Sequence, residues 1–137
     1  NMICHTLICA QNIIVDHQSD RVSLINIVER ISSPNFPIVA PLMVYVILKQ
    51  ESQEQANEPL VFLKIDIGET ELAKSAFDVV FTDGFSKTVL NIEGLIIPNA
   101  GALTFSVWDN EKQLKSYEAI VQDSGSTKVK PTLLPGS

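Results

Sequence analysis

Short segments rich in Val, Ile, Leu and Phe alternate with polar stretches along the whole chain. An amphipathic period of 3.6 residues does not persist for a dozen residues, so the pattern favours strands over helices. The predicted strands cover residues 3–15, 21–30, 42–50, 60–67, 74–81, 88–97, 103–108 and 114–121. We therefore predict an all-β fold, an antiparallel two-sheet sandwich of about 7–9 strands.

Two of these segments show how the strands sit in the sandwich. Residues 42–50 carry apolar side chains at both odd and even positions, which predicts a central strand covered on both sides. Residues 60–67 alternate more strictly, with Lys64 and Asp66 on the polar side, so we expect one face of this strand to contact solvent.

Proline and glycine mark the connections between strands. The stretch from Ser32 to Pro37, closed by Pro41, cannot donate to a continuous ladder and is predicted to be a loop or a sheet-edge crossing. Asp83-Gly84 predicts a tight turn. No interdomain linker or repeat is present, so we predict one domain over residues 1–122, followed by a loose tail over 123–137.

Composition narrows the class of partner. Hydrophobic residues make up 45% of the 137 residues and the net charge is -6, which predicts a folded, acidic domain. Lys and Arg never cluster and no apolar run approaches the ~20 residues of a membrane helix, so we expect neither a nucleic-acid nor a membrane partner. Residues 51–58 form an acidic and amide-rich run, either a docking loop for a basic partner or a solvated connection.

The N-terminus and the cysteines bear on location. The opening Asn1-Met2-Ile3 is typical of a residue left by tag removal before the natural initiator, and no signal-peptide pattern follows. Two cysteines suit a reducing compartment and a fold without disulfides. We therefore expect a cytoplasmic protein.

One passage carries a resemblance to a known fold. Leu90-Asn91-Ile92-Glu93-Gly94-Leu95, followed by Pro98, Gly101, Leu103 and Phe105, resembles the passage from strand E to strand F of immunoglobulin domains. Leu103 and Phe105 stand where that family has its corner tyrosine and second core cysteine. The resemblance, over about sixteen residues, therefore implies an immunoglobulin-like sandwich without the tyrosine corner and the disulfide.

The order of segments is also similar to that of a group of small bacterial proteins of unknown function. Their pattern has a second strand like Leu24 to Arg30, a Pro-x-Phe-Pro loop like Pro34 to Pro37, and a Pro-x-x-Gly hairpin like Pro98 to Gly101. This resemblance implies a bacterial protein and carries no activity with it.

The soft metal ligands gather near the N-terminus as Cys4, His5, Cys9 and His17. Strand alternation puts Cys4 and Cys9 on opposite faces, and leaves His5 and Cys9 about 13 Å apart at ~3.3 Å per residue. Neither pair is then able to chelate zinc, and the two cysteines are too far apart for a disulfide. We predict no metal site, and the chain contains no glycine-rich loop that indicates another cofactor.

No motif marks a catalytic residue. A nucleophile, histidine and acid can be combined from Cys9 or a serine, His5 or His17, and Asp16 or Asp20, but no serine lies in a Gly-x-Ser-x-Gly elbow. The adjacent Asp16 and His17 are explained more simply by an Asx turn. We assign no catalytic residues and lean towards a protein that is not an enzyme.

The candidate binding residues are Pro34, Asn35, Phe36 and Trp108. The first three lie in a predicted end loop, where Phe36 either contacts a partner or closes the edge of the core. Trp108 is opposite in parity to Phe105 and Val107, so it is predicted to face outward as an aromatic anchor or to be covered by the tail.

The leading functional hypothesis is a non-enzymatic binding or protein-interaction module. Its expected partner is another protein or a second copy in a homo-oligomer, because strands with two apolar faces are only partly covered by two sheets. One alternative is a small hydrolase or isomerase whose site is assembled from separate strands. Another is a structural component of a larger assembly.

Overall fold

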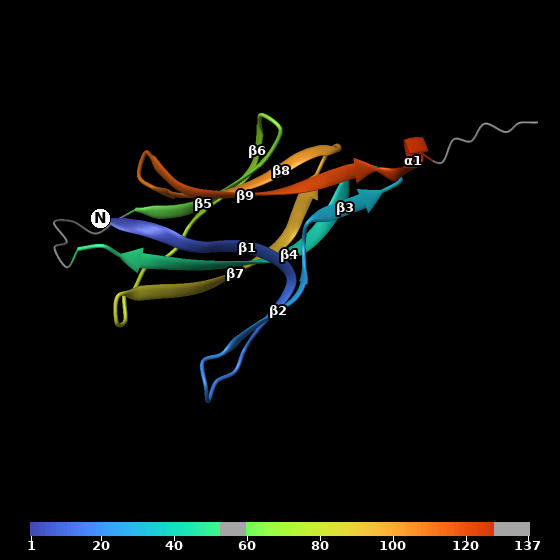
Figure 1. Ribbon diagram of the computed structural model, residues 1–137. Helices are drawn as coiled ribbons and strands as arrows, with labels where there is room; N and C mark the ends of the chain where they lie inside the picture. The colour runs from blue at the N-terminus through green and yellow to red at the C-terminus, as the bar shows by residue number, and fades with distance from the viewer. Residues whose placement is uncertain (53–59, 128–137) are drawn as a thin grey trace, which may run out of the picture.

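A computed structural model describes residues 1–52 and 60–127, and within these ranges it contains nine strands and one short helix (Figure 1). The strands are β1 (Met2–Val15), β2 (Val22–Ile27), β3 (Arg30–Ser33), β4 (Ile38–Gln50), β5 (Val61–Ile67), β6 (Thr70–Ala76), β7 (Phe85–Ile97), β8 (Gly101–Asp109) and β9 (Lys112–Asp123). The helix α1 covers Ser124–Thr127. It spans four residues, and no helix in the described ranges has the length and apolarity needed to cross a membrane.

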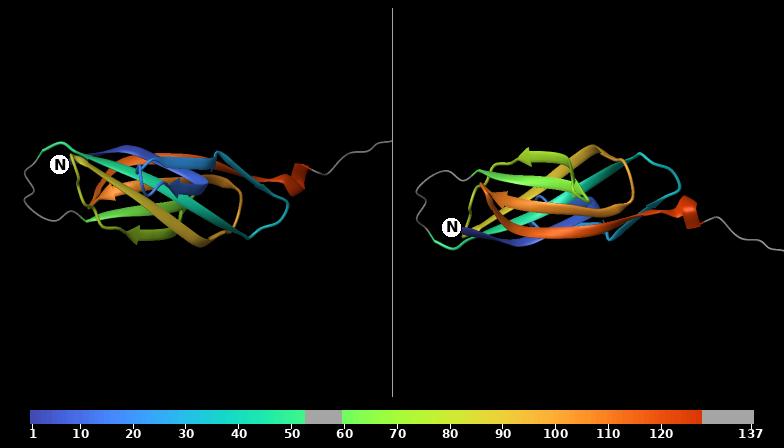
Figure 2. Two further views of the ribbon diagram at one scale, coloured as in Figure 1. Left: turned by 90° about the horizontal axis from the view of Figure 1, so that it is seen from below. Right: turned by 90° about the horizontal axis from the view of Figure 1, so that it is seen from above.

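The strands form two layers, which are seen edge-on in Figure 1 and face-on, one behind the other, in Figure 2. The four-stranded sheet has the order β2-β1-β4-β7, and the five-stranded sheet has the order β3-β9-β8-β5-β6. Neighbouring strands are antiparallel except β3 and β9, which run parallel. The prediction of an all-β, mostly antiparallel two-sheet sandwich is confirmed.

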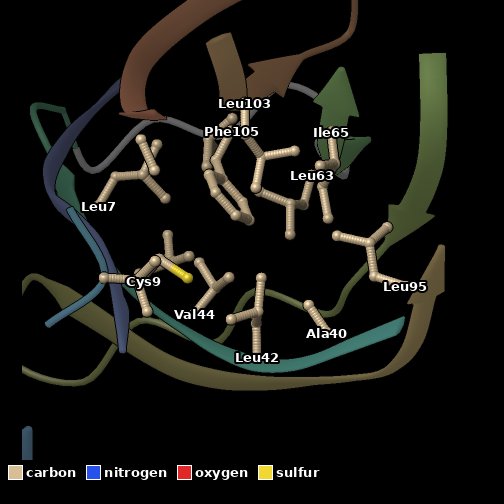
Figure 3. Close-up of a cluster of buried hydrophobic side chains, with 14 of the residues drawn as sticks. Leu7, Cys9, Ala40, Leu42, Val44, Leu63, Ile65, Leu95, Leu103 and Phe105 are labelled. Atoms are coloured by element: carbon tan, nitrogen blue, oxygen red, sulfur yellow. The ribbon is translucent and has the colours of Figure 1, made fainter. Parts of the chain in front are cut away.

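The core lies between the two sheets. Alternate side chains of β4, β5 and β8 point into it, because successive residues of a strand face opposite sides. Phe105 of β8 is the largest fully buried side chain. Figure 3 shows it above the residues that β1 and β4 contribute from the other layer, among them Cys9, Leu42 and Val44. As predicted, β4 is central in its sheet.

The predicted strand over residues 21–30 is in fact two strands in different sheets. β2 ends at Ile27, and β3 begins at Arg30 on the edge of the opposite sheet. Between them, the Val28 amide donates to the Cys9 carbonyl of β1, and the Ile120 amide of β9 donates to the Glu29 carbonyl. The chain changes sheets here without a glycine or proline to mark the point.

Two further predictions are correct only in part. The predicted loop over residues 32–41 is shorter than expected, because β4 already begins at Ile38 and accommodates Pro41 at a register shift. The predicted strand over 74–81 ends at Ala76 as part of β6. The side chains of Phe77, Val79 and Phe81 alternate into the core, but they belong to no ladder.

The remaining boundaries follow the predicted pattern more closely. The Asp83-Gly84 turn is present, with both residues at positive φ, 54° and 85°. The connection from Pro98 to Gly101 joins β7 to β8 in the other sheet, so it is a crossing and not a hairpin. The predicted domain boundary at residue 122 stays a prediction, since residues 128–137 lie outside the described residues. Most of the acidic run over 51–58 also lies outside the described residues, because the first described range stops at residue 52. Its role as a docking loop therefore stays a prediction.

Candidate interaction surface

A solvent-open cleft of about 580 Å³ lies on the outer face of the four-stranded sheet. We call it the sheet-face cleft. Three parts of the chain form it: the β1–β2 hairpin, the middle of β4, and the start of β7 with the segment that precedes it. Its lining residues are Val15, Asp20, Val22, Tyr45, Val80, Thr82, Asp83, Phe85, Lys87 and Val89.

The floor of the cleft is apolar and fixed in the sheet. Tyr45 points outward from β4 and is only 8% exposed, because it packs with Ala10 and Ile13 in a second apolar cluster outside the main core. Val89 lies opposite Tyr45 on β7. Burial raises the pKa of the Tyr45 hydroxyl above its ordinary value of 10.0, so this group is neutral at physiological pH.

One wall of the cleft is the β1–β2 hairpin, which projects from the sandwich in Figure 1. One face of this hairpin turns Ile13, Val22 and Leu24 towards Tyr45. The turn that closes it is held by two backbone hydrogen bonds, from the Asp16 amide to the Arg21 carbonyl at 2.9 Å and from the Asp20 amide to the Asp16 carbonyl at 2.8 Å. The hairpin therefore covers part of the outer sheet face and leaves the cleft beyond its tip.

The opposite wall is the segment that leads into β7. Val80 is 73% exposed there although it lines the cleft, and the bridge between Thr82 and Phe85 fixes the turn beside it. Charges stand around this apolar surface: the carboxyl groups of Asp20 and Asp83 on the two walls and the ammonium group of Lys87 on β7. The arrangement suits an apolar side chain flanked by a charged group.

The residues predicted from the end loop lie elsewhere. Phe36 is half-buried and packs against the main core, whereas Pro34 and Asn35 are exposed. Gly125 of α1 lies against this loop, since a β-carbon built on it would be 2.5 Å from the Pro34 carbonyl oxygen. None of these residues lines the sheet-face cleft. Their role in binding stays a prediction.

Trp108 lies on the outer face of the other sheet. As the parity argument predicted, it points away from the core, where it stacks on Phe62 of β5 with ring centroids 6.1 Å apart. Its Nε1–H donates to the Ser106 hydroxyl at 2.8 Å, and the Lys64 ammonium lies 5.7 Å from its ring centroid. Trp108 is half-buried, covered by neighbours on its own sheet, and its role as a binding anchor stays a prediction.

The prediction that Cys4 and Cys9 point to opposite faces is wrong. A register shift between Cys4 and Thr6 inserts an extra residue at His5, so both cysteines and Leu7 face the core. His5 is exposed, and so is His17 in the hairpin turn. Burial raises the pKa of the free Cys4 thiol to about 11 and that of the free Cys9 thiol to about 12.

Those raised pKa values leave the two thiols protonated and poor as nucleophiles or metal ligands. Across residues 1–52 and 60–127, no group of three or more His, Cys, Asp or Glu side chains is placed to hold a metal ion.

The sequence carried only a weak signal for the cleft. Its residues come from three separate stretches, and no motif connects them. The one hint was the outward apolar set on residues 42–50, namely Met43, Tyr45 and Ile47, which required some cover beyond the second sheet. No model of a known protein family matches the chain, and no curated protein matches it in sequence.

Proposed function

We propose that this protein is a non-enzymatic interaction module that binds a segment of a partner protein in the sheet-face cleft. The observation that carries the proposal is an open cleft on the outer face of the four-stranded sheet, with an apolar floor at buried Tyr45 and exposed Val80 on its rim. Surfaces of this kind accept an apolar anchor side chain, while polar groups at the rim fix its orientation.

The charges define the chemistry of the partner segment. Among the described residues that line the cleft, Asp20 and Asp83 place a carboxyl group on each wall, against the one ammonium group of Lys87. The whole chain carries a net charge of -6, which attracts cationic partners and repels acidic ones. The segment that fits best has an apolar side chain next to a basic residue.

A phage-displayed library of random peptides, selected on the purified protein, tests this function. We expect enrichment of peptides with an apolar residue beside Lys or Arg. Val80→Asp should weaken their binding about tenfold or more, since it puts a charge on the apolar rim. The control Leu60→Asp changes a similarly exposed apolar residue outside the cleft and should leave binding unchanged.

The double variant Asp20→Asn, Asp83→Asn isolates the electrostatic part. Both residues have positive φ, 58° and 54°, which asparagine tolerates, so the turns should be kept while both charges are removed. We expect the preference for Lys and Arg to disappear while the apolar preference remains. The proposal would be overturned if the selected peptides bound the Val80→Asp variant as tightly as they bind the unmodified protein.

We also propose that the sandwich has an immunoglobulin-like topology. We propose further that the protein is bacterial and is located in the cytoplasm. The passage that resembles strands E and F has its two halves on β7 and β8, which lie in opposite sheets, as strands E and F do in that family. Two free, buried cysteines agree with a reducing compartment. Fractionation of the source cells tests the location.

A further inference from the structure

The two tyrosines of the chain differ in what their hydroxyl groups bond. The Tyr117 hydroxyl of β9 donates to the Val28 carbonyl. Tyr45 of β4 is the more buried of the two, at 8% exposed, yet among the described residues its hydroxyl has no hydrogen-bond partner. Buried polar groups of folded proteins are nearly always paired. An unpaired hydroxyl on the floor of a cleft therefore points to a partner supplied by a bound molecule.

The Tyr45 hydroxyl opens into the sheet-face cleft. Within the buried and half-buried residues that the structure describes, every completely shielded side-chain nitrogen or oxygen has a hydrogen-bond partner. Since the Tyr45 oxygen has none, it is not completely shielded. The rest of the side chain packs with Ala10 and Ile13, and the residue lines the cleft. The small exposed part of Tyr45 therefore lies where a bound segment would cover it.

Covering this hydroxyl makes the cleft selective. A segment that places an apolar side chain on the floor displaces water from the Tyr45 hydroxyl. If the segment brings no acceptor, binding is weakened, because the lost hydrogen bond to water is not replaced. The hydroxyl therefore discriminates between segments, and between the registers of one segment, by whether an acceptor reaches it.

The surroundings of Tyr45 favour a neutral acceptor. Its cross-strand neighbour on β7 is the apolar Val89. A carboxylate of the partner would be attracted by Lys87, but it would also meet the carboxyl groups of Asp20 and Asp83 and a chain of net charge -6. A main-chain carbonyl carries no net charge and occurs in every residue of a peptide. It is also attached to the same α-carbon as the apolar side chain that enters the cleft.

We infer that the Tyr45 hydroxyl donates a hydrogen bond to a main-chain carbonyl of the segment bound in the sheet-face cleft, and that this bond fixes the register of the segment. The inference rests on the proposed function and adds a second selective element to it. The carboxyl groups of Asp20 and Asp83 select the residue beside the apolar anchor, whereas the Tyr45 hydroxyl selects where the main chain lies. Its contribution is made in binding and not in folding.

Isothermal titration calorimetry with a synthetic peptide selected on the unmodified protein tests the inference. Tyr45→Phe should weaken binding about tenfold, since it removes the donor and leaves a covered carbonyl unpaired. Its urea unfolding midpoint at neutral pH should be unchanged, because the hydroxyl has no partner among the described residues. Tyr117→Phe is the matched control. It loses the hydrogen bond to Val28, so its midpoint should fall while its peptide affinity stays the same.

A thioamide scan of the same peptide locates the acceptor. It replaces one carbonyl oxygen at a time by sulfur, which is a weaker acceptor. One position should weaken binding to the unmodified protein and have little effect on binding to Tyr45→Phe, because the two changes remove the same hydrogen bond. Unchanged affinity of Tyr45→Phe, or the absence of such a coupled position, would contradict the inference.

The outcomes separate this inference from the proposed function. If peptides bind the cleft and Val80→Asp weakens them while Tyr45→Phe does not, the interaction module stands and only the role of the Tyr45 hydroxyl fails. If no peptide is enriched on the unmodified protein, the proposed function and the inference fail together.

Discussion

The outer faces of the two sheets differ in how far neighbouring residues cover their apolar side chains. On the five-stranded sheet, Phe62 and Trp108 stack on each other, and the ammonium groups of Lys74 and Lys64 lie 4.3 Å and 5.7 Å from their respective ring centroids. On the four-stranded sheet, the apolar surface around Tyr45 opens into the sheet-face cleft. One face covers its aromatic groups with its own residues, and the other leaves an apolar surface accessible.

This difference predicts which substitutions change the stability of the protein and which change its binding. Side chains that are covered by neighbours contribute mainly to the free energy of unfolding, whereas exposed residues on a rim contribute little to it. We therefore expect substitutions on the five-stranded face to change stability, and substitutions on the cleft rim to change binding.

The largest effect should come from Trp108→Ala. It removes the stack on Phe62 and leaves the Ser106 hydroxyl without its donor, so the free energy of unfolding should fall by about 2–4 kcal/mol. Urea unfolding followed by far-ultraviolet circular dichroism measures this, because the variant has lost the only tryptophan of the chain. Unchanged stability with lost peptide binding would show that Trp108 is an anchor, and the contrast between the faces would fail.

A smaller effect should follow from Lys74→Ala. The Lys74 ammonium lies over the face of the Phe62 ring, and its loss should reduce the free energy of unfolding by about 0.5–1 kcal/mol. Lys87→Ala, on the cleft side, is the matched control and should change stability by less than about 0.5 kcal/mol. Equal effects of the two substitutions on the free energy of unfolding would show that the lysines on the five-stranded face do not stabilise the aromatic rings that they cover.

The smallest effect concerns pH and the floor of the cleft. The pKa of Tyr45 is raised by burial in the folded state, so the unfolded chain loses this proton first as the pH rises above 10.0. The contribution of the protonated Tyr45 hydroxyl to the free energy of unfolding is fully present below that pH. It decreases as the pH rises through the folded-state pKa. Stability should therefore fall as the pH rises above 10.0, and less steeply in Tyr45→Phe. An identical slope in both proteins would contradict a buried hydroxyl at this position.

Much of the fold was predictable because alternation of apolar residues reports directly on burial. Val61, Leu63 and Ile65 were assigned inward from the pattern alone, and each is 1% exposed. The same reasoning failed where burial occurs without pairing, as at Phe77, or where one inserted residue at His5 reverses the parity of a strand.

The candidate site was less predictable than the fold. Tyr45, Val80 and Asp20 are brought together only by the path of the β1–β2 hairpin over the outer sheet face. Nothing in the local sequence shows how far that hairpin bends. The change of sheet at Val28 was missed for a related reason, because its side chain is buried as a strand residue would be.

The crossing at Val28 has a mechanical consequence. The amide of Val28 bonds to β1 in one sheet, its carbonyl accepts from the Tyr117 hydroxyl of β9 in the other, and the next carbonyl also accepts from β9. A force that slides the sheets past each other therefore loads these bonds in shear, all at one point of the backbone. The hairpin that emerges just before this point is anchored to both layers, so a pull on its tip is transmitted to the whole sandwich.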